Sequence, residues 1–357
     1  MQKKLIALAV AGLVSGAAFA QTNVTVYGVL DMGYTYSKGD KLKFSGIEGG
    51  NLNGNRIGFR GTEALGNGLN AVFQAEFGFR GDNFNKDGTK ASDGAFHNVR
   101  NSWVGLQHAK YGTFTAGRQN SVAYDWIAKG YASDITGVHP SNLLVSDGTV
   151  GFAQLNSSDR VNNSIKYQTP NWNGFEVRAV YGFGEKVGPT QDTSDDAKYS
   201  LGAAYKNGPI DVALIYAGTA KHDAVANDGS INGWSLGGSY DFKVVKAFAQ
   251  YQAESNKNAG ADTDKAAWTI GARVPVTKAG TAIVEYVNAK ADFNNASKDA
   301  KASGWGIGYE HAFSKRTVGY TSLSYISNNE LTNAGFNKVG AYDESSKAFN
   351  IGVRHNF

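Results

Sequence analysis

Cysteine is absent from this sequence of 357 residues, and charges of one sign do not dominate it. Without cysteine the chain owes no stability to disulfide bonds, so something else must hold its fold together. The 35 basic residues nearly balance the 31 acidic residues, which gives a formal net charge of +4 at pH 7. This balance argues against a general nucleic-acid binder, whose surface would be strongly basic.

Long apolar runs are also missing after the first 20 residues. A helix needs about 20 consecutive apolar residues to cross a bilayer, and the mean hydropathy of the chain is only −0.35. Helical membrane spans are therefore not expected. Membrane-spanning strands stay possible, because only alternate residues of such a strand face lipid.

The first 20 residues have the organisation of a secretory signal peptide. Two lysines precede an apolar run, which ends in the small-residue sequence Ala18-Phe19-Ala20. A membrane anchor is the alternative, but the apolar run is short for a span. We therefore expect residues 1–20 to be removed and residues 21–357 to form one domain.

Alternation of apolar and polar residues is the strongest pattern in the rest of the chain. In residues 68–80 the apolar side chains Ala71, Phe73, Ala75, Phe77 and Phe79 fall at every second position. A period of two indicates a β-strand with one apolar face. About sixteen segments share this pattern, each near the length that a tilted strand needs to cross a bilayer: 24–36, 56–63, 68–80, 99–107, 112–119, 160–169, 174–183, 198–206, 210–218, 233–242, 245–254, 266–274, 281–289, 304–313, 317–326 and 347–357.

The connections between these segments are alternately short and long. Short ones such as 206–209 carry the Gly, Asn and Pro of tight turns. The long ones are polar and include 37–55, 81–98 and 327–346. This rhythm is typical of a chain that crosses a membrane repeatedly, with short turns on one side and long loops on the other. A soluble sandwich would not show it.

Backbone hydrogen bonding then predicts the architecture. In hydrocarbon every backbone N–H and C=O must be paired within the protein, so strands can span a membrane only as a closed barrel. We expect an all-β fold, a closed antiparallel transmembrane barrel of about sixteen strands enclosing an aqueous channel. Segment 347–357 should pair with the first strand, which places Phe357 near Val24.

Residues 120–159 form a long connection without a clear period. The segment contains Tyr124, Trp126 and Phe152, and disordered segments are depleted in such residues. Unstructured loops beyond about 15 residues are usually functional or disordered. We therefore expect this segment to pack against the barrel and, when folded inward, to narrow the channel.

Strand parity predicts which charged side chains line the channel. Parity is ambiguous for Arg100 and Arg118, and Arg100 is placed inside because a charge facing lipid costs about 2–4 kcal/mol at the bilayer centre. The predicted lumen residues are Arg56, Arg60, Glu76, Arg80, Arg100, Arg118, Arg160, Lys166 and Arg178. The inward segment would supply Asp125, Asp134 and Asp147 as an acidic counterpart. Such opposed charges create a transverse field, and we expect a mild anion preference.

Several segments, in order along residues 21–357, resemble the general porins of the β-proteobacterial outer membrane, of the neisserial and Bordetella–Burkholderia type. They include NVTVYGVLDMG, NRIGFRGTEALGNGLNAVFQAE, VGLQHAKYGTFTAGRQ, NNSIKYQTPNWNGF, HAFSKRT and GVRHNF. The resemblance implies a sixteen-stranded barrel, three barrels per molecule, and a third loop folded into each pore. It also implies that the barrel assembly machinery reads the strand that ends in Phe357.

The resemblance further implies a location and a set of site residues. The barrel would lie in the outer membrane of a Gram-negative bacterium, surrounded by lipid and lipopolysaccharide, and would pass ions and small hydrophilic solutes. The family has an arginine cluster with a few acids at its narrowest point. That pattern matches Arg56, Arg100 and Arg160, together with Glu76 and either Asp134 or Asp125. Neither a cofactor nor a resident metal is expected.

Other functions stay open at this point. A solute-specific channel would show conductance block at low solute concentration, and a surface adhesin could coexist with a pore. An enzyme would need a nucleophile and a base within hydrogen-bond reach. Among the histidines, which are the candidate bases, only His311 and His355 lie in predicted strands, and no partner residues are evident. The six histidines show no metal-ligand spacing. A cation that bridges the acidic outer loops is a further alternative.

Overall fold

The structure is a computed structural model. It describes residues 23–81, 96–126, 150–152, 155, 160–184, 196–222, 229–257, 262–334, 336 and 342–357. The predicted signal peptide and two of the predicted acidic residues, Asp134 and Asp147, lie outside the described residues.

The described chain consists almost entirely of antiparallel strands. Each strand pairs with its neighbours, and β1 pairs with β17, which closes the sheet into a barrel. The elements are β1 (Asn23–Lys38), β2 (Lys43–Gly49), β3 (Arg56–Gly66), β4 (Leu69–Phe79), β5 (Phe96–His108), β6 (Gly112–Asn120), α2 (Val122–Trp126), β7 (Arg160–Gln168), β8 (Phe175–Gly182), β9 (Lys198–Asn207), β10 (Ile210–His222), β11 (Gly229–Asp241), β12 (Lys246–Lys257), β13 (Thr263–Pro275), β14 (Gly280–Phe293), β15 (Ala300–Ala312), β16 (Thr317–Asn328) and β17 (Ser345–Asn356).

Strands β2 and β3 share one position in the barrel wall. The C-terminal part of β1, Met32–Lys38, pairs with β2, and its N-terminal part, Asn23–Val29, pairs with β3. The wall therefore has sixteen strand positions, which confirms the predicted barrel. The prediction that residues 37–55 form a loop was wrong in one respect, because residues 43–49 form the strand β2. The interruption at residues 50–55 hides this strand from a simple search for alternation.

The buried carboxylate of Asp31 holds residues 50–55, which interrupt the wall between β2 and β3, in place. Asp31 is fully buried, and its Oδ2 accepts hydrogen bonds of 2.6 Å from the backbone N–H groups of Leu52 and Asn53. The Tyr320 hydroxyl donates to Oδ1 of the same carboxylate at 2.6 Å. Two backbone donors released from the strand ladder are thus paired, and the broken strand is tied to β16.

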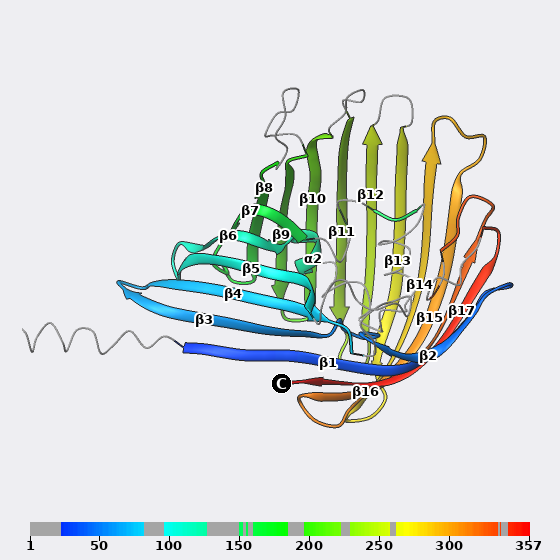
Figure 1. Ribbon diagram of the computed structural model, residues 1–357, viewed down its shortest axis with the longest axis horizontal. Helices are drawn as coiled ribbons and strands as arrows, with labels where there is room; N and C mark the ends of the chain where they lie inside the picture. The colour runs from blue at the N-terminus through cyan, green and yellow to red at the C-terminus, as the bar shows by residue number, and fades with distance from the viewer. Residues whose placement is uncertain are drawn as a thin grey trace, which may run out of the picture.

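The seam between β1 and β17 closes the ring. Ten residue pairs run from Val29–Asn356 to Lys38–Lys347, and two backbone hydrogen bonds of 3.0 and 3.1 Å join Phe357 to Gly28. Figure 1 shows the C-terminus beside β1. The predicted pairing of first and final strands is confirmed, with Phe357 opposite Gly28 rather than Val24. The shift arises because the first residues of β1, 23–27, extend past the end of β17 and pair with β3.

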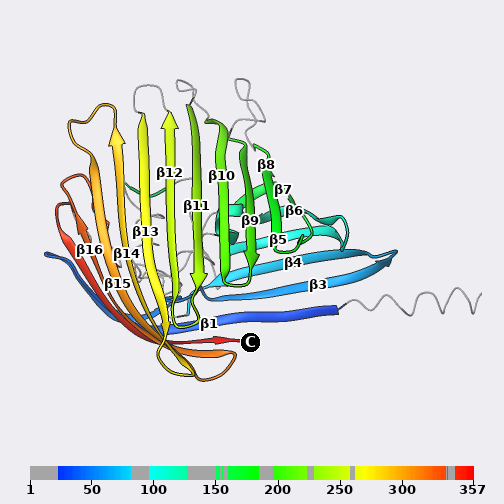
Figure 2. The same ribbon diagram turned by 180° about the vertical axis from the view of Figure 1, so that it is seen from behind.

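The two faces of the wall differ as the alternation predicted. Along β10 the exposed Leu214 and Tyr216 alternate with the buried Ile215 and Ala217. Aromatic rings pair across strands on the outer face, as in Trp234–Tyr251, Trp268–Tyr286 and Trp305–Tyr325. Such rings mark the level of the lipid headgroups. In Figures 1 and 2, β3 and β4 run across the view while β11 to β13 run up it, as tilted strands of different barrel walls do.

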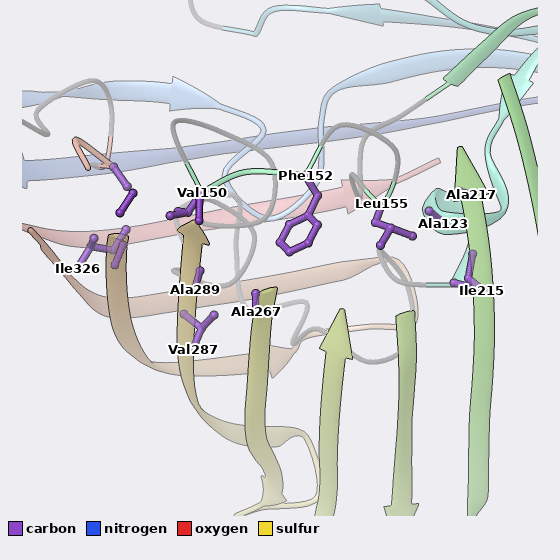
Figure 3. Packing of buried hydrophobic residues seen from close by; sticks show 14 of the residues in the cluster. Ala123, Val150, Phe152, Leu155, Ile215, Ala217, Ala267, Val287, Ala289 and Ile326 are labelled. Carbon is purple, nitrogen blue, oxygen red and sulfur yellow. The ribbon is translucent and has the colours of Figure 1, made fainter. Parts of the chain in front are cut away.

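An apolar cluster covers part of the inner face. Figure 3 shows Val150, Phe152 and Leu155 beside inward-facing residues of β10, β13 and β14. The wall residues in this region are small, and Ala267, Val287 and Ala289 are at most 2% exposed. The described parts of segment 120–159 therefore pack against the barrel wall.

Candidate functional site

The short helix α2 stands against the inner faces of β6, β8, β9 and β10. Its start is capped by Ser121, whose Oγ accepts a hydrogen bond from the backbone N–H of Tyr124 at 3.0 Å. The backbone N–H of Val122 donates to the Ser200 hydroxyl at 3.3 Å. A Cβ atom at Gly202 would lie 2.4 Å from the Trp126 ring, so the absence of a side chain there lets the helix approach β9.

A first charged group surrounds Glu76, which is 5% exposed. The Arg100 Nε donates to Glu76 Oε1 at 2.7 Å, and the Tyr27 hydroxyl donates to Oε2 at 3.0 Å. Arg100 also donates to the hydroxyl of Tyr124 on α2 at 2.9 Å. The Arg160 guanidinium lies 4.6 Å from the centre of the Tyr124 ring, a cation–π contact. Two arginines of the wall thus meet one residue of the helix.

A β-bulge places Arg100 in this group. The register between β4 and β5 shifts at Glu76 and Phe77, because Asn101 faces Glu76 while Val99 faces Phe77. Arg100 has no partner of its own in the ladder, and it joins Asn101 on the inner side. Strict alternation would point one of the two outward. The bulge removes the ambiguity that strand parity left open at this position.

A second charged group surrounds Asp125 of α2. Its Oδ2 accepts from Arg178 Nη1 at 2.9 Å and also from the ammonium of Lys166. Arg178 in turn pairs with Glu176 at 2.5 Å, and its guanidinium lies 5.0 Å from the centre of the Trp126 ring. The helix therefore presents one acid and two aromatic rings to a cationic wall. Paired and partly buried charges of this kind fix geometry, because removing one partner leaves the other uncompensated.

A polar cavity lies beside both groups, lined by side chains that include Arg56, Glu76, Tyr124, Asp125 and Lys166. Arg56 contacts only the Gly54 carbonyl oxygen at 3.0 Å among the hydrogen bonds of the described residues. Arg60 is exposed, and its guanidinium lies 5.2 Å from the centre of the Tyr27 ring. We call the following residues the lumen cluster: Arg56, Arg60, Glu76, Arg100, Asp125, Arg160, Lys166, Glu176 and Arg178. Six of them are cationic and three are anionic.

The structure does not bring every predicted residue into the lumen cluster. Arg118 donates to the Val99 carbonyl oxygen at 2.6 Å and to the side chain of Asn162, neither of which belongs to the lumen cluster, and it stands opposite the exposed Ser102 in the pairing of β5 with β6. Arg80 follows the end of β4 and forms no ion pair with another described residue. Asn163 has a φ of 43°, and Val161 is buried where parity placed Asn162 inward. The alternation in β7 is interrupted there.

Two aromatic contacts were not predicted from the sequence. Tyr27 bonds Glu76, and Tyr124 links Arg100 with Arg160. Tyr124 was noted only as an apolar residue of segment 120–159, and alternation carries no signal for contacts between a loop and a wall. Among the described residues no cluster of potential metal ligands is present, and none of their helices is long and apolar enough to cross a membrane.

Comparison with known proteins gives concordant results. Residues 7–331 match the family model described as Gram-negative porin. The chain is 32% identical to outer membrane porin protein 32 of Delftia acidovorans and 30% identical to an outer membrane porin protein of Bordetella pertussis, with both chains covered completely in each case. The solved anion-selective porin from Comamonas acidovorans superposes with a TM-score of 0.78 at 28% identity, covering 94% of this chain and 100% of that one.

Proposed function

Because this chain belongs to the Gram-negative porin family, we propose that its pore is mildly anion-selective and that the lumen cluster sets this preference. The protein is an outer-membrane porin, through which ions and small hydrophilic solutes pass by passive diffusion. Family and fold point to a channel and not to an enzyme.

The charge of the lumen cluster carries the proposal. Its six cations exceed its three carboxylates, and all nine side chains belong to β3, β4, β5, β7, β8 and the helix α2. A fixed excess of positive charge at a wetted constriction raises the local concentration of anions. Arg56 and Arg60 contribute most directly, because neither forms an ion pair with another described residue and Arg60 is exposed. The anion selectivity of the Comamonas acidovorans porin agrees with this inference.

The test is the zero-current potential of the purified protein in a planar bilayer under a gradient of KCl. We expect the sign that corresponds to a higher permeability of Cl⁻ than of K⁺. The magnitude should fall as the salt concentration rises, because mobile ions screen the fixed charges. A potential with the sign of K⁺ preference would contradict the proposed selectivity and leave the porin assignment intact.

We also propose that α2 and its flanking segment form the constriction, as predicted for residues 120–159. The ion pairs of Asp125 with Lys166 and Arg178, and the packing of Trp126 on Gly202, support this role. Sequence analysis offered either Asp134 or Asp125 as the loop acid at the narrowest point, and of these two only Asp125 lies within the described residues. Assembly as a homotrimer, contact with lipopolysaccharide and recognition of Phe357 by the barrel assembly machinery belong to the same proposal and rest on the family.

Replacing Gly202 by leucine (Gly202→Leu) should displace α2 and raise the single-channel conductance. The new Cβ would lie 2.4 Å from Trp126 and 2.8 Å from Val122, both on the helix. Overpacking of this kind costs about 1–3 kcal/mol, which the helix can relieve by moving away from β9. The neighbouring substitution Leu201→Met faces outward and should leave the conductance unchanged. Equal conductance in both variants would argue against a constriction formed by α2.

A further inference from the structure

Trp103 of β5 places its indole ring on the inner face of the barrel wall. It pairs with Gln74 of β4, which faces inward as Glu76 does, and with Gly117 of β6 on the other side. Gly105 is the next inward residue of β5. Because neither glycine has a side chain, the ring is not covered from these two positions, and Trp103 stays partly exposed to the lumen.

A cavity of about 400 Å³ lies beside this ring. Val72 and Trp103 give the cavity apolar surface, and its polar lining includes Arg60, Gln107 and Thr113. The last two flank the short turn between β5 and β6, so the cavity lies toward the end of the barrel that carries the short turns. We call this space the tryptophan cavity. Its volume falls in the range of about 300–1,000 Å³ that is usual for ligand sites.

The charges around the tryptophan cavity favour an anion. Among the described residues that line it, Arg60 carries the one charge. The polar cavity beside α2 differs, because its lining includes the carboxylates of Glu76 and Asp125. An anion in the tryptophan cavity therefore meets a guanidinium without a carboxylate competing in the same lining. A single cation suits an anion that carries one negative charge.

The Tyr27 ring positions the guanidinium of Arg60, whose centre lies 5.2 Å from the centre of the ring. Gln74 stands between Arg60 and Trp103 in the sheet, but its amide donates to the Tyr27 hydroxyl, so its side chain is directed toward Tyr27. Neighbouring strands lie about 4.8 Å apart, which separates the backbones of Arg60 and Trp103 by about 9.6 Å. Both side chains line the same cavity across that separation.

We propose that the tryptophan cavity binds small aromatic carboxylates, with the carboxylate on Arg60 and the ring against Trp103. A guanidinium donates two parallel hydrogen bonds to a carboxylate, and an indole face attracts a planar ring beyond the gain from burial alone. A bare inorganic anion would leave the apolar surface of Val72 and Trp103 unused. The inference rests on the proposed function, because a solute must enter the pore to reach the cavity.

The test is the conductance of single channels in a planar bilayer in symmetric KCl, titrated with potassium benzoate. We expect a saturable reduction of the current, because bound benzoate occupies part of the lumen. Cyclohexanecarboxylate keeps the charge without a planar ring, and benzamide keeps the ring without the charge. Each should need a concentration roughly tenfold higher for the same reduction. A current that benzoate leaves unchanged would overturn the proposal, as would equal half-blocking concentrations of benzoate and either of the other probes.

Two single substitutions separate the cavity from the general field of the lumen. Arg60→Gln and Arg56→Gln each remove one positive charge from the lumen cluster, but Arg60 lines the tryptophan cavity and Arg56 lines the polar cavity beside α2. Arg60→Gln should raise the half-blocking concentration of benzoate roughly tenfold, and Arg56→Gln less than about threefold, since attraction over a distance is screened by salt. Equal effects of the two variants would assign the block to the general field and overturn the proposal.

A second pair of variants tests the ring. Trp103→Leu should raise the half-blocking concentration of benzoate roughly tenfold, whereas Trp103→Phe, which keeps an aromatic ring, should restore most of the affinity. Trp268→Leu is the matched control, because Trp268 faces Tyr286 on the outer side of the wall and should not affect the block. Equal half-blocking concentrations in Trp103→Leu and Trp268→Leu would contradict the proposal. If Trp103→Leu does not close its barrel, the two arginine variants decide.

The zero-current potential keeps this inference apart from the proposed selectivity. A Cl⁻ preference together with a current that benzoate does not reduce would leave the proposed function intact and overturn the aromatic carboxylate site. A K⁺ preference together with a benzoate block that depends on Arg60 and Trp103 would support the site and contradict the proposed selectivity.

Discussion

Replacing Gly28 by valine (Gly28→Val) should leave much of the protein unable to close its barrel. A Cβ atom at residue 28 would lie 2.2 Å from Cζ of Phe357 and 2.7 Å from the carbonyl oxygen of Arg56. The phenyl ring could turn away, but the backbone oxygen cannot without disturbing the pairing of β1 with β3. We expect the free energy of unfolding to fall by about 3 kcal/mol, at the upper end of overpacking effects. The heat-sensitive mobility of the refolded barrel in gel electrophoresis measures the closed fraction.

A double-mutant cycle isolates the contact of Gly28 with Phe357. The single substitution Phe357→Ala should itself reduce the closed fraction, because it removes the ring that covers Gly28 on the outer face. If the ring causes most of the damage in Gly28→Val, the two changes together should cost less than the sum of the single effects. Strictly additive effects would instead assign the damage to the oxygen of Arg56. A closed fraction of Gly28→Val equal to that of the unchanged protein would contradict both contacts.

The combined substitution Arg56→Glu and Arg60→Glu should reverse the ion preference of the pore. It changes the lumen cluster from six cations and three anions to four cations and five anions, so its net charge changes sign. Because neither arginine forms an ion pair with a described residue, the change leaves no described carboxylate without its partner. The zero-current potential under a KCl gradient should accordingly take the sign of K⁺ preference.

Two control proteins separate this field effect from a general change of charge. The neutral pair Arg56→Gln and Arg60→Gln should give a potential between those of the unchanged and the reversed protein. The pair Lys278→Glu and Lys315→Glu makes the same change of charge in the short turns, outside the lumen cluster, and should shift the potential little because the turns are screened by salt. If the turn variant reverses the potential as strongly as the lumen variant, the lumen cluster does not set the selectivity.

The barrel could be predicted from the sequence because its determinants are periodic. Alternation fixed the faces of residues such as Leu214 and Tyr216, and the rhythm of the connections indicated the number of crossings. The exceptions are aperiodic. Strand β2 was taken as part of a loop, since residues 50–55 interrupt the pattern and are held by Asp31, whose partner Tyr320 is 289 residues away. A contact over that separation leaves no trace in local sequence.

The lumen cluster was predictable in composition but not in pairing. Parity selects Glu76 and Lys166 as inward residues, and the energetic cost of a charge in lipid selects Arg100. The bulge beside Glu76 and the positive φ at Asn163 alter the parity in ways that residue types do not specify. The contacts of Tyr124 and Asp125 depend on how α2 docks, which is a tertiary property with no period of its own.

The apolar cluster on the inner wall has a consequence for the path of a solute. Where Phe152 and Leu155 cover the small residues of β10, β13 and β14, side chains such as Val287 and Ala289 have no exposed surface. Water cannot run along that part of the circumference. If α2 and its flanking segment form the constriction as proposed, we expect permeating molecules to pass on the other side of the lumen, along the arginine-bearing strands β3, β5, β7 and β8.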